Sequence, residues 1–201
     1  FIADSSTYQY NDGDEITGLI DAFDSVVVFK RRSVWKITFS VSSQGIVIPN
    51  VFLLTRNVGC AAPKTVRQVE NDIFFLTDKG VYALGQQAYY TADLRTNEVS
   101  AKIRPTLQNM NRIQIGNCTA IYFDNKYRLS YPSGGSNVND REIWFDRERA
   151  GWVGPMNYPA SPQVYEVFID GANAEHLVWG DSADNYVTEY STAYSSDKGD
   201  S

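Results

Sequence analysis

Side chains that commonly carry catalysis are scarce in this chain of 201 residues. A serine or cysteine nucleophile usually needs a histidine to take its proton, and the only histidine is His176. Period-two alternation over residues 175–179 places His176 on the same strand face as Val178 and opposite Leu177, which favours a structural, hydrogen-bonded histidine. No glycine loop has the spacing of a P-loop or a dinucleotide-binding turn. The sequence therefore predicts no catalytic residue, no cofactor and no enzymatic activity.

Metal-ligating side chains are not grouped as a metal centre requires. Cys60, Cys118 and one histidine, all far apart in sequence, do not form a zinc site, and two cysteines are too few for a disulfide framework. We expect both thiols to be unpaired and buried. Two oxygen-rich sets could hold Ca²⁺, but neither has the ligand register of a calcium motif, so we interpret both as turn residues. These sets are Asp12, Asp14 and Glu15, and Asp181, Asp184 and Asn185.

Basic side chains suggest two further kinds of site. A sialidase-like centre needs an arginine cluster. Four arginines could form one, but their spacing in the sequence does not support it. These arginines are Arg104, Arg112, Arg128 and Arg141. The densest basic stretch, residues 30–32, could contact nucleic-acid phosphates, but a solvated hairpin tip is the favoured interpretation. The formal net charge of −6 excludes a global field that attracts nucleic acid or anionic lipid.

Short β-strands are the elements expected to position these residues. The composition, 13% aromatic and 43% hydrophobic, suits strands and is sufficient for a buried core. The clearest unit is the hairpin 71–84, in which the apolar run 73–76 predicts a strand buried on both faces. Asp78-Lys79-Gly80 supplies its turn. Because a register slip would turn apolar side chains to the wrong face, we expect Gly80 to matter more to stability than any charged residue.

Similar groups of strands start about every 45–55 residues, which is close to the period of propeller blades. We predict an all-β fold with at least four antiparallel sheets in a single domain, 1–201, of β-propeller type. The alternative is a β-sandwich. Helix is expected only near 97–110, as a short insert in which Pro105 prevents a longer helix. Residues 40–49 are predicted to be a loop and 87–94 an outer strand. The predicted blades are 14–58, 59–96, 114–156 and 162–192.

A segment rich in small or turn-forming residues, followed by apolar strands, occurs twice along the chain. Asn11-Asp12-Gly13-Asp14-Glu15-Ile16-Thr17-Gly18 precedes apolar strands at 27–30 and 34–37, and Gly59-Cys60-Ala61-Ala62-Pro63 precedes the hairpin 71–84. Over residues 11–190 this pattern resembles the propeller proteins of tailed-phage virions. The segment 99–105 is similar to the short helix that often follows in that family.

The resemblance implies a structural, non-catalytic virion component of the tail nozzle or neck, made in the bacterial cytoplasm. Its partners would be other copies of itself, in a ring that lines or seals the DNA channel, and other tail proteins. DNA would pass only in transit, and ring contacts would come from loops such as 40–49 and 133–140. No apolar run is long enough for membrane insertion. Such proteins usually carry extra domains, so we expect this chain to be a fragment.

A carbohydrate-binding or glycan-cleaving propeller, such as a receptor-binding tail protein, is the alternative function. Sugars stack on flat apolar rings, so exposed aromatic side chains would favour it, although propellers also use aromatic residues for blade packing. The candidates are Trp152, Tyr158, Trp179 and Tyr194.

Overall fold

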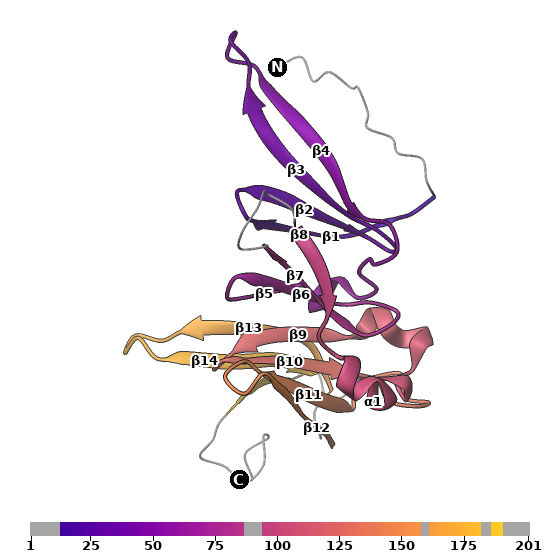
Figure 1. Cartoon of the computed structure of the whole chain (residues 1–201). Helices are drawn as coiled ribbons and strands as arrows, with labels where there is room; N and C mark the ends of the chain where they lie inside the picture. Colours follow the sequence, from indigo (N-terminus) through magenta and orange to yellow (C-terminus); the bar gives the residue numbers. More distant parts are fainter. Residues whose placement is uncertain (1–12, 87–93, 158–160, 182–185, 191–201) are drawn as a thin grey trace.

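The computed structural model describes residues 13–86, 94–157, 161–181 and 186–190, and these form four antiparallel sheets. Within each sheet the strands follow one another in chain order (Figure 1). The first sheet contains β1 (Ile16–Ala22), β2 (Ser25–Lys30), β3 (Val34–Val41) and β4 (Val47–Thr55). The second contains β5 (Arg67–Val69), β6 (Asp72–Leu76), β7 (Val81–Gln86) and β8 (Leu94–Glu98). The third contains β9 (Thr119–Phe123), β10 (Lys126–Tyr131), β11 (Arg141–Asp146) and β12 (Gly151–Asn157). The fourth contains β13 (Pro162–Ile169), β14 (Glu175–Asp181) and β15 (Val187–Glu189).

The expectation of an all-β fold with at least four antiparallel sheets is confirmed. The turns between consecutive strands explain locally why these strands pair in antiparallel sheets. Phe23 and Asp24 join β1 to β2, and Asp124 and Asn125 join β9 to β10, with positive φ at all four residues. Two-residue turns with this backbone match the twist of the strands that they connect. No sheet closes on itself within the described part of the chain.

Helical turns are more widespread than the sequence predicted. The predicted insert is present as η2 (Ala101–Ile103) and α1 (Arg104–Gln108). The expectation of helix only near 97–110 is wrong, because η1 (Pro63–Thr65) and η3 (Arg112–Asn117) lie outside that range. In η1 the backbone N–H and hydroxyl of Thr65 both donate to the Ala62 carbonyl. In η3 the Asn111 side chain accepts a hydrogen bond from the Ile113 N–H and caps the first turn.

Residues 40–49 are not the predicted loop. β3 continues to Val41 and β4 begins at Val47, so only a tight turn separates the strands. The Ser42 hydroxyl closes this turn by accepting hydrogen bonds from the N–H groups of Gln44 and Ile46. For the predicted outer strand 87–94, residues 87–93 lie outside the described residues, and β8 occupies the outer position from Leu94 onward.

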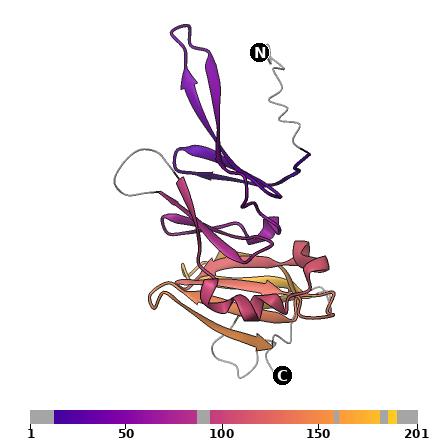
Figure 2. The same cartoon turned by 45° about the vertical axis from the view of Figure 1, so that its right-hand side comes forward.

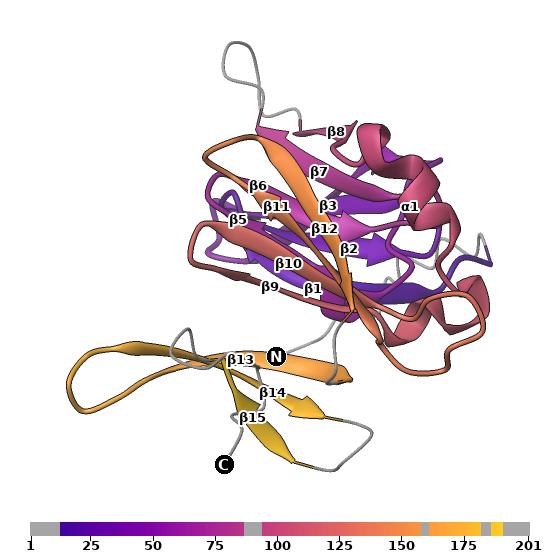
Figure 3. The same ribbon diagram turned by 90° about the horizontal axis from the view of Figure 1, so that it is seen from below.

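The first three sheets are stacked in chain order, and the fourth lies against the β9 side of the third (Figures 1 and 3). The same order is seen after a rotation of the view (Figure 2). β6 fills both interfaces of the second sheet, since Ile73 and Phe75 belong to the core shared with the first sheet, and Phe74 and Leu76 to the core shared with the third. The two-sided burial of residues 73–76 is therefore confirmed.

Specific contacts fix the third sheet against its two neighbours. The Tyr127 hydroxyl on β10 donates to the Thr65 carbonyl in η1 at 2.8 Å. On the other side, Tyr165, Leu177 and Trp179 of the fourth sheet form a small core with side chains of β9. Strand β9 contacts β5 and β13, which are the first strands of the two neighbouring sheets.

Candidate functional site

One face of the β3–β4 hairpin is apolar from its base to its tip. Side chains alternate along each strand, so the residues of alternate cross-strand pairs share a face. Four such pairs form the apolar face, and Val28 on β2 continues it. We call this surface the outer face of the first sheet, because it points away from the second sheet. The pairs are Trp35–Leu53, Ile37–Val51, Phe39–Pro49 and Val41–Val47.

The tip of this face is uncovered. Trp35 at the base is 9% exposed, whereas Phe39, Val41 and Val47 are 59%, 68% and 60% exposed. Figure 1 shows β3 and β4 extending beyond the other strands of the first sheet. Contiguous exposed apolar surface of this kind marks an interaction site more often than isolated exposed residues do.

The last sheet presents a second uncovered face, on which apolar side chains alternate with charged ones. Tyr165, Leu177 and Trp179 point into the core, so the alternate residues of β13 and β14 point outward. Val164 and Phe168 are half exposed on this outer face of the fourth sheet. The two outer faces therefore belong to the first and the last sheet in chain order.

His176 lies on the outer face of the fourth sheet and contacts two carboxylates. Its Nδ1 is 2.6 Å from Glu189 Oε1 and its Nε2 is 3.1 Å from Asp170 Oδ2. The hydrogen bond to Glu189, followed by that to Asp170, raises the pKa of His176. The ring also stacks on Phe168, with centroids 4.8 Å apart. The predicted placement, beside Val178 and opposite Leu177, is confirmed, and both ring nitrogens are occupied by structural contacts.

Both cysteines are free and buried, as expected. Burial raises the pKa of the Cys60 thiol to about 11 and that of the Cys118 thiol to about 12. Both groups therefore stay protonated at neutral pH, and neither is a nucleophile or a metal ligand under those conditions.

The four arginines of the imagined sialidase-like cluster occupy separate environments. Arg104 pairs with Glu98, and Arg112 donates to the backbone carbonyls of residues 78 and 107. Arg128 is buried against Glu142, and Arg141 lies 3.8 Å from Asp140. The structure thus gives these four guanidinium groups no shared centre.

Oxygen-rich loops are held by backbone contacts where they are described. The Asp14 carboxylate accepts hydrogen bonds from the Arg32 N–H and the Ser33 hydroxyl, while Asp181 ends β14 as a buried side chain. Asp12, Asp184 and Asn185 lie outside the described residues. Within the described ranges, no three His, Cys, Asp or Glu side chains are grouped as metal ligands.

The interpretation of residues 30–32 as a solvated tip is wrong for two of the three residues. Lys30 is buried, with Nζ 5.8 Å from the centre of the Trp35 ring. Arg31 reaches across to the second sheet and donates to the Ala61 carbonyl and to Asp78. Only Arg32 is exposed, because the adjacent second sheet covers the other side of this turn.

The aromatic candidates for glycan stacking are engaged in packing where they are described. Trp179 is buried, so its ring is not available for stacking on a sugar. Trp152 packs on Phe145 and donates its indole N–H to the Val99 carbonyl. Tyr158 and Tyr194 lie outside the described residues.

The loop 133–140, expected to supply ring contacts, is fastened to its own sheet. The Asp140 carboxylate accepts hydrogen bonds from the Ser133 N–H at 2.7 Å and from its hydroxyl at 2.6 Å. The Asn111 side chain, which precedes η3, donates to the Ser136 carbonyl. This loop is therefore a firmly held surface.

Sequence reasoning missed a buried ion pair between the third and fourth sheets. Arg128 Nε donates to Glu142 Oε1 at 2.7 Å, and the Tyr165 hydroxyl donates to Glu142 Oε2 at 2.8 Å. The alternation in β10 contained the signal. Arg128 and Ser130 share one strand face while Tyr127 and Leu129 share the other, so a polar face should have been expected.

No protein-family model matches this sequence, and no significant match is found among curated proteins. No helix within the described ranges is long and apolar enough to cross a membrane.

Proposed function

We propose that this chain is a non-catalytic structural module of a bacteriophage tail, an arc of four propeller-like blades that joins other copies and other tail proteins in a ring around the DNA channel. One observation carries the proposal. Four meander sheets, each with its strands in chain order, follow one another along the chain, the first three face to face and the fourth against the β9 side of the third (Figures 1 and 3).

This arrangement is what a propeller requires of successive blades. A propeller repeats small meander sheets around an axis, with the first strand of each sheet nearest that axis. Contacts between the first strands β5, β9 and β13 agree with this arrangement. A sandwich instead packs two sheets face to face around a single core, whereas here the second sheet is covered on both faces by two separate cores.

The outer faces of the first and fourth sheets supply the contacts between copies. Both interfaces of the second sheet are made by apolar faces, and exposed apolar side chains are left on the outer faces of the first and fourth sheets. A head-to-tail contact between two copies would cover both ends at once. Heterologous contacts of this kind generate rings when the rotation between copies closes. The proposed partner is therefore a second copy of this chain.

DNA would pass through such a ring without being held, in keeping with the net charge of −6. The module would be made in the host cytoplasm and would function in the virion tail. Carbohydrate binding is the less favoured alternative because Trp179 is buried and Trp152 is used in packing. A glycan array tests that alternative directly.

Negative-stain electron microscopy and light scattering of the purified protein test the ring. We expect closed particles for the wild-type chain and single copies for Phe39→Asp, because a charge would be placed in the apolar contact. Ile113→Asp is the matched control, since Ile113 is 90% exposed but lies on η3, away from both outer faces. A wild-type chain that stays monomeric at every concentration, or a Phe39→Asp variant that still forms rings, would contradict the proposal.

A further inference from the structure

Three loops that are distant in sequence meet at the edge shared by the first and second sheets. They are the β2–β3 turn, the segment that leaves β4, and the β6–β7 turn. Together they surround a pocket of about 400 Å³. Its lining consists of Arg31, Arg32, Arg56, Asn57, Val58, Gly59, Thr77, Asp78 and Lys79.

Backbone packing builds this pocket. A Cβ on Gly59 would lie 2.4 Å from the Lys30 carbonyl oxygen, so only glycine lets the two segments approach this closely. Beside it, the Cys60 N–H donates to the same carbonyl at 2.9 Å. On the far side, the Thr77 hydroxyl accepts hydrogen bonds from the N–H groups of Lys79 and Gly80 and fixes the β6–β7 turn. The loops are therefore held in place before any ligand arrives.

The charge of this pocket is opposite to that of the chain as a whole. Four cationic side chains and one carboxylate line it, although the formal net charge of the chain is −6. Arg31 is paired with Asp78 at 2.7 Å. The side chains of Arg32, Arg56 and Lys79 make no hydrogen bond or ion pair with another described residue. Three unpaired cations thus surround one polar pocket.

A second carboxylate lies at this edge, because Asp14 accepts hydrogen bonds from the backbone N–H of Arg32 and from the Ser33 hydroxyl. The four cations of the pocket lining outnumber the carboxylates of Asp14 and Asp78. Arg112 adds a fifth cation at this edge, because its Nη1 donates to the Asp78 carbonyl at 2.7 Å. Like charges held this close together repel one another, and a bound anion removes that repulsion.

We propose that this pocket binds a phosphate group, either as a free ion or small phosphate ester or as part of a nucleic-acid backbone. Guanidinium groups present planar pairs of donors that match two phosphate oxygens, and the lysine ammonium adds a point charge. The pocket volume lies in the range of small-ligand sites. This inference does not depend on the phage assignment, because it requires only the charges and geometry of the three loops.

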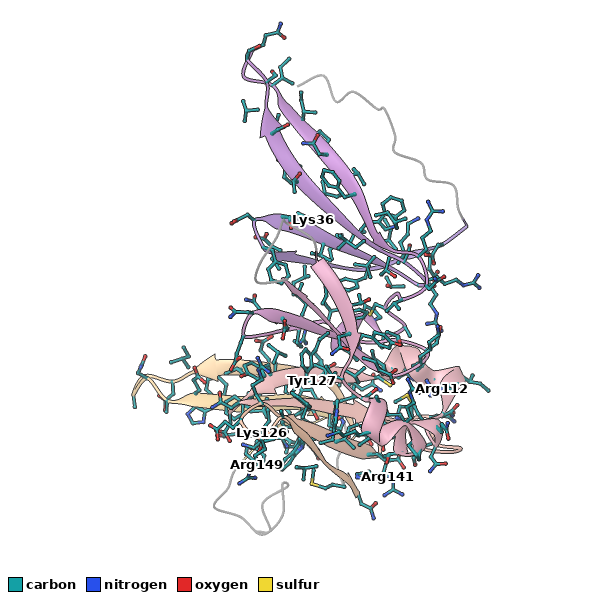
Figure 4. All side chains as sticks on the ribbon, viewed as in Figure 1. Lys36, Arg112, Lys126, Tyr127, Arg141 and Arg149 are labelled. Carbon is teal, nitrogen blue, oxygen red and sulfur yellow. The ribbon has the colours of Figure 1, made fainter. Side chains whose placement is uncertain are left out.

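Two probes distinguish the sources of the phosphate, namely inorganic phosphate followed by calorimetry and a short labelled DNA duplex followed by fluorescence anisotropy. The test variant is Arg56→Ala/Lys79→Ala, whose two side chains are exposed and unpaired, so that folding should be retained. The control is Arg149→Ala, because Arg149 is 83% exposed and lies far from Arg112 (Figure 4). A denaturant melt of each variant verifies that it is folded.

We expect at least one probe to bind the wild-type chain and the control equally, and to bind the double variant about tenfold more weakly or worse, since charge-assisted hydrogen bonds are lost. Binding of inorganic phosphate alone identifies a small-anion site, and binding of the duplex alone identifies a site for backbone phosphates. For the duplex, the salt dependence of binding should also become shallower in the double variant. Absence of binding by both probes, or equal affinity in the double variant and the wild-type chain, overturns the proposal.

Discussion

Removing one charge from the buried Arg128–Glu142 pair should destabilise the chain more than removing any exposed charge. Both side chains are buried between the third and fourth sheets. The Glu142 carboxylate also accepts hydrogen bonds from the Trp144 indole and the Tyr165 hydroxyl. Glu142→Gln keeps the volume but removes the carboxylate charge that faces the buried guanidinium group of Arg128. Breaking a buried pair in this way costs about 3–5 kcal/mol.

The measurement is the free energy of unfolding from urea melts followed by tryptophan fluorescence. Arg147→Ala is the control, because Arg147 forms a partly exposed pair with Glu70 at 2.8 Å, which should contribute no more than about 1 kcal/mol. Replacing both buried partners, as in Arg128→Met/Glu142→Leu, should recover most of the loss, since no charge then remains buried. If Glu142→Gln costs no more than Arg147→Ala, the buried pair is not the anchor that its geometry indicates.

Three other expectations rest on separate features. Gly80→Val should lower the free energy of unfolding by about 1–3 kcal/mol, because a Cβ at this position would lie 2.3 Å from Ser100 Oγ. Cys60 and Cys118 should resist iodoacetamide in the folded protein and react after denaturation, as measured by mass spectrometry, because burial raises the pKa of both thiols. His176→Gln should reduce stability more at pH 5 than at pH 9, as measured by urea melts at the two pH values.

The sign of the pH effect follows from the raised pKa of His176. A protonated imidazole is stabilised by Glu189 and Asp170 in the folded chain only, so this stabilisation is fully present below the unfolded pKa and is lost as pH rises through the folded pKa. Equal effects of the substitution at both pH values would contradict the ion-pair geometry. The expectation that Gly80 matters more to stability than any charged residue is therefore restricted to exposed charges such as Arg149, because breaking the buried Arg128–Glu142 pair should cost about 3–5 kcal/mol.

The sheets were predictable because their signals are local. The apolar run 73–76 fits a strand buried on both faces, and turn residues separate the strands of each meander. The β3–β4 hairpin shows where local signals mislead. Ser40 and Pro49 are typical of loops, yet Pro49 lies on β4, an edge strand, where a missing N–H need not break a ladder of hydrogen bonds.

Burial and the basic pocket could not be predicted because they depend on which sheet lies next to which. Lys30 carries a charge typical of surface residues, yet it is covered by packing that sequence alone does not specify. The pocket draws its cations from three loops, so no window of the sequence contains it. The polar face of β10 is the exception, because alternation already placed Arg128 and Ser130 together.

The free energy gained by burying side chains and the free-energy cost of association together explain why the outer faces of the first and fourth sheets would need a large partner surface. Burying an aromatic side chain removes about 150–250 Å² from water, at about 25 cal/mol for each Å² of apolar area. Phe39 is 59% exposed, so covering it would contribute about 2–4 kcal/mol. Association costs about 4–15 kcal/mol in lost freedom, which one side chain cannot offset. Phe39, Val41 and Val47 must therefore be covered together, and their position on one continuous face of the hairpin permits a single opposing sheet to do so.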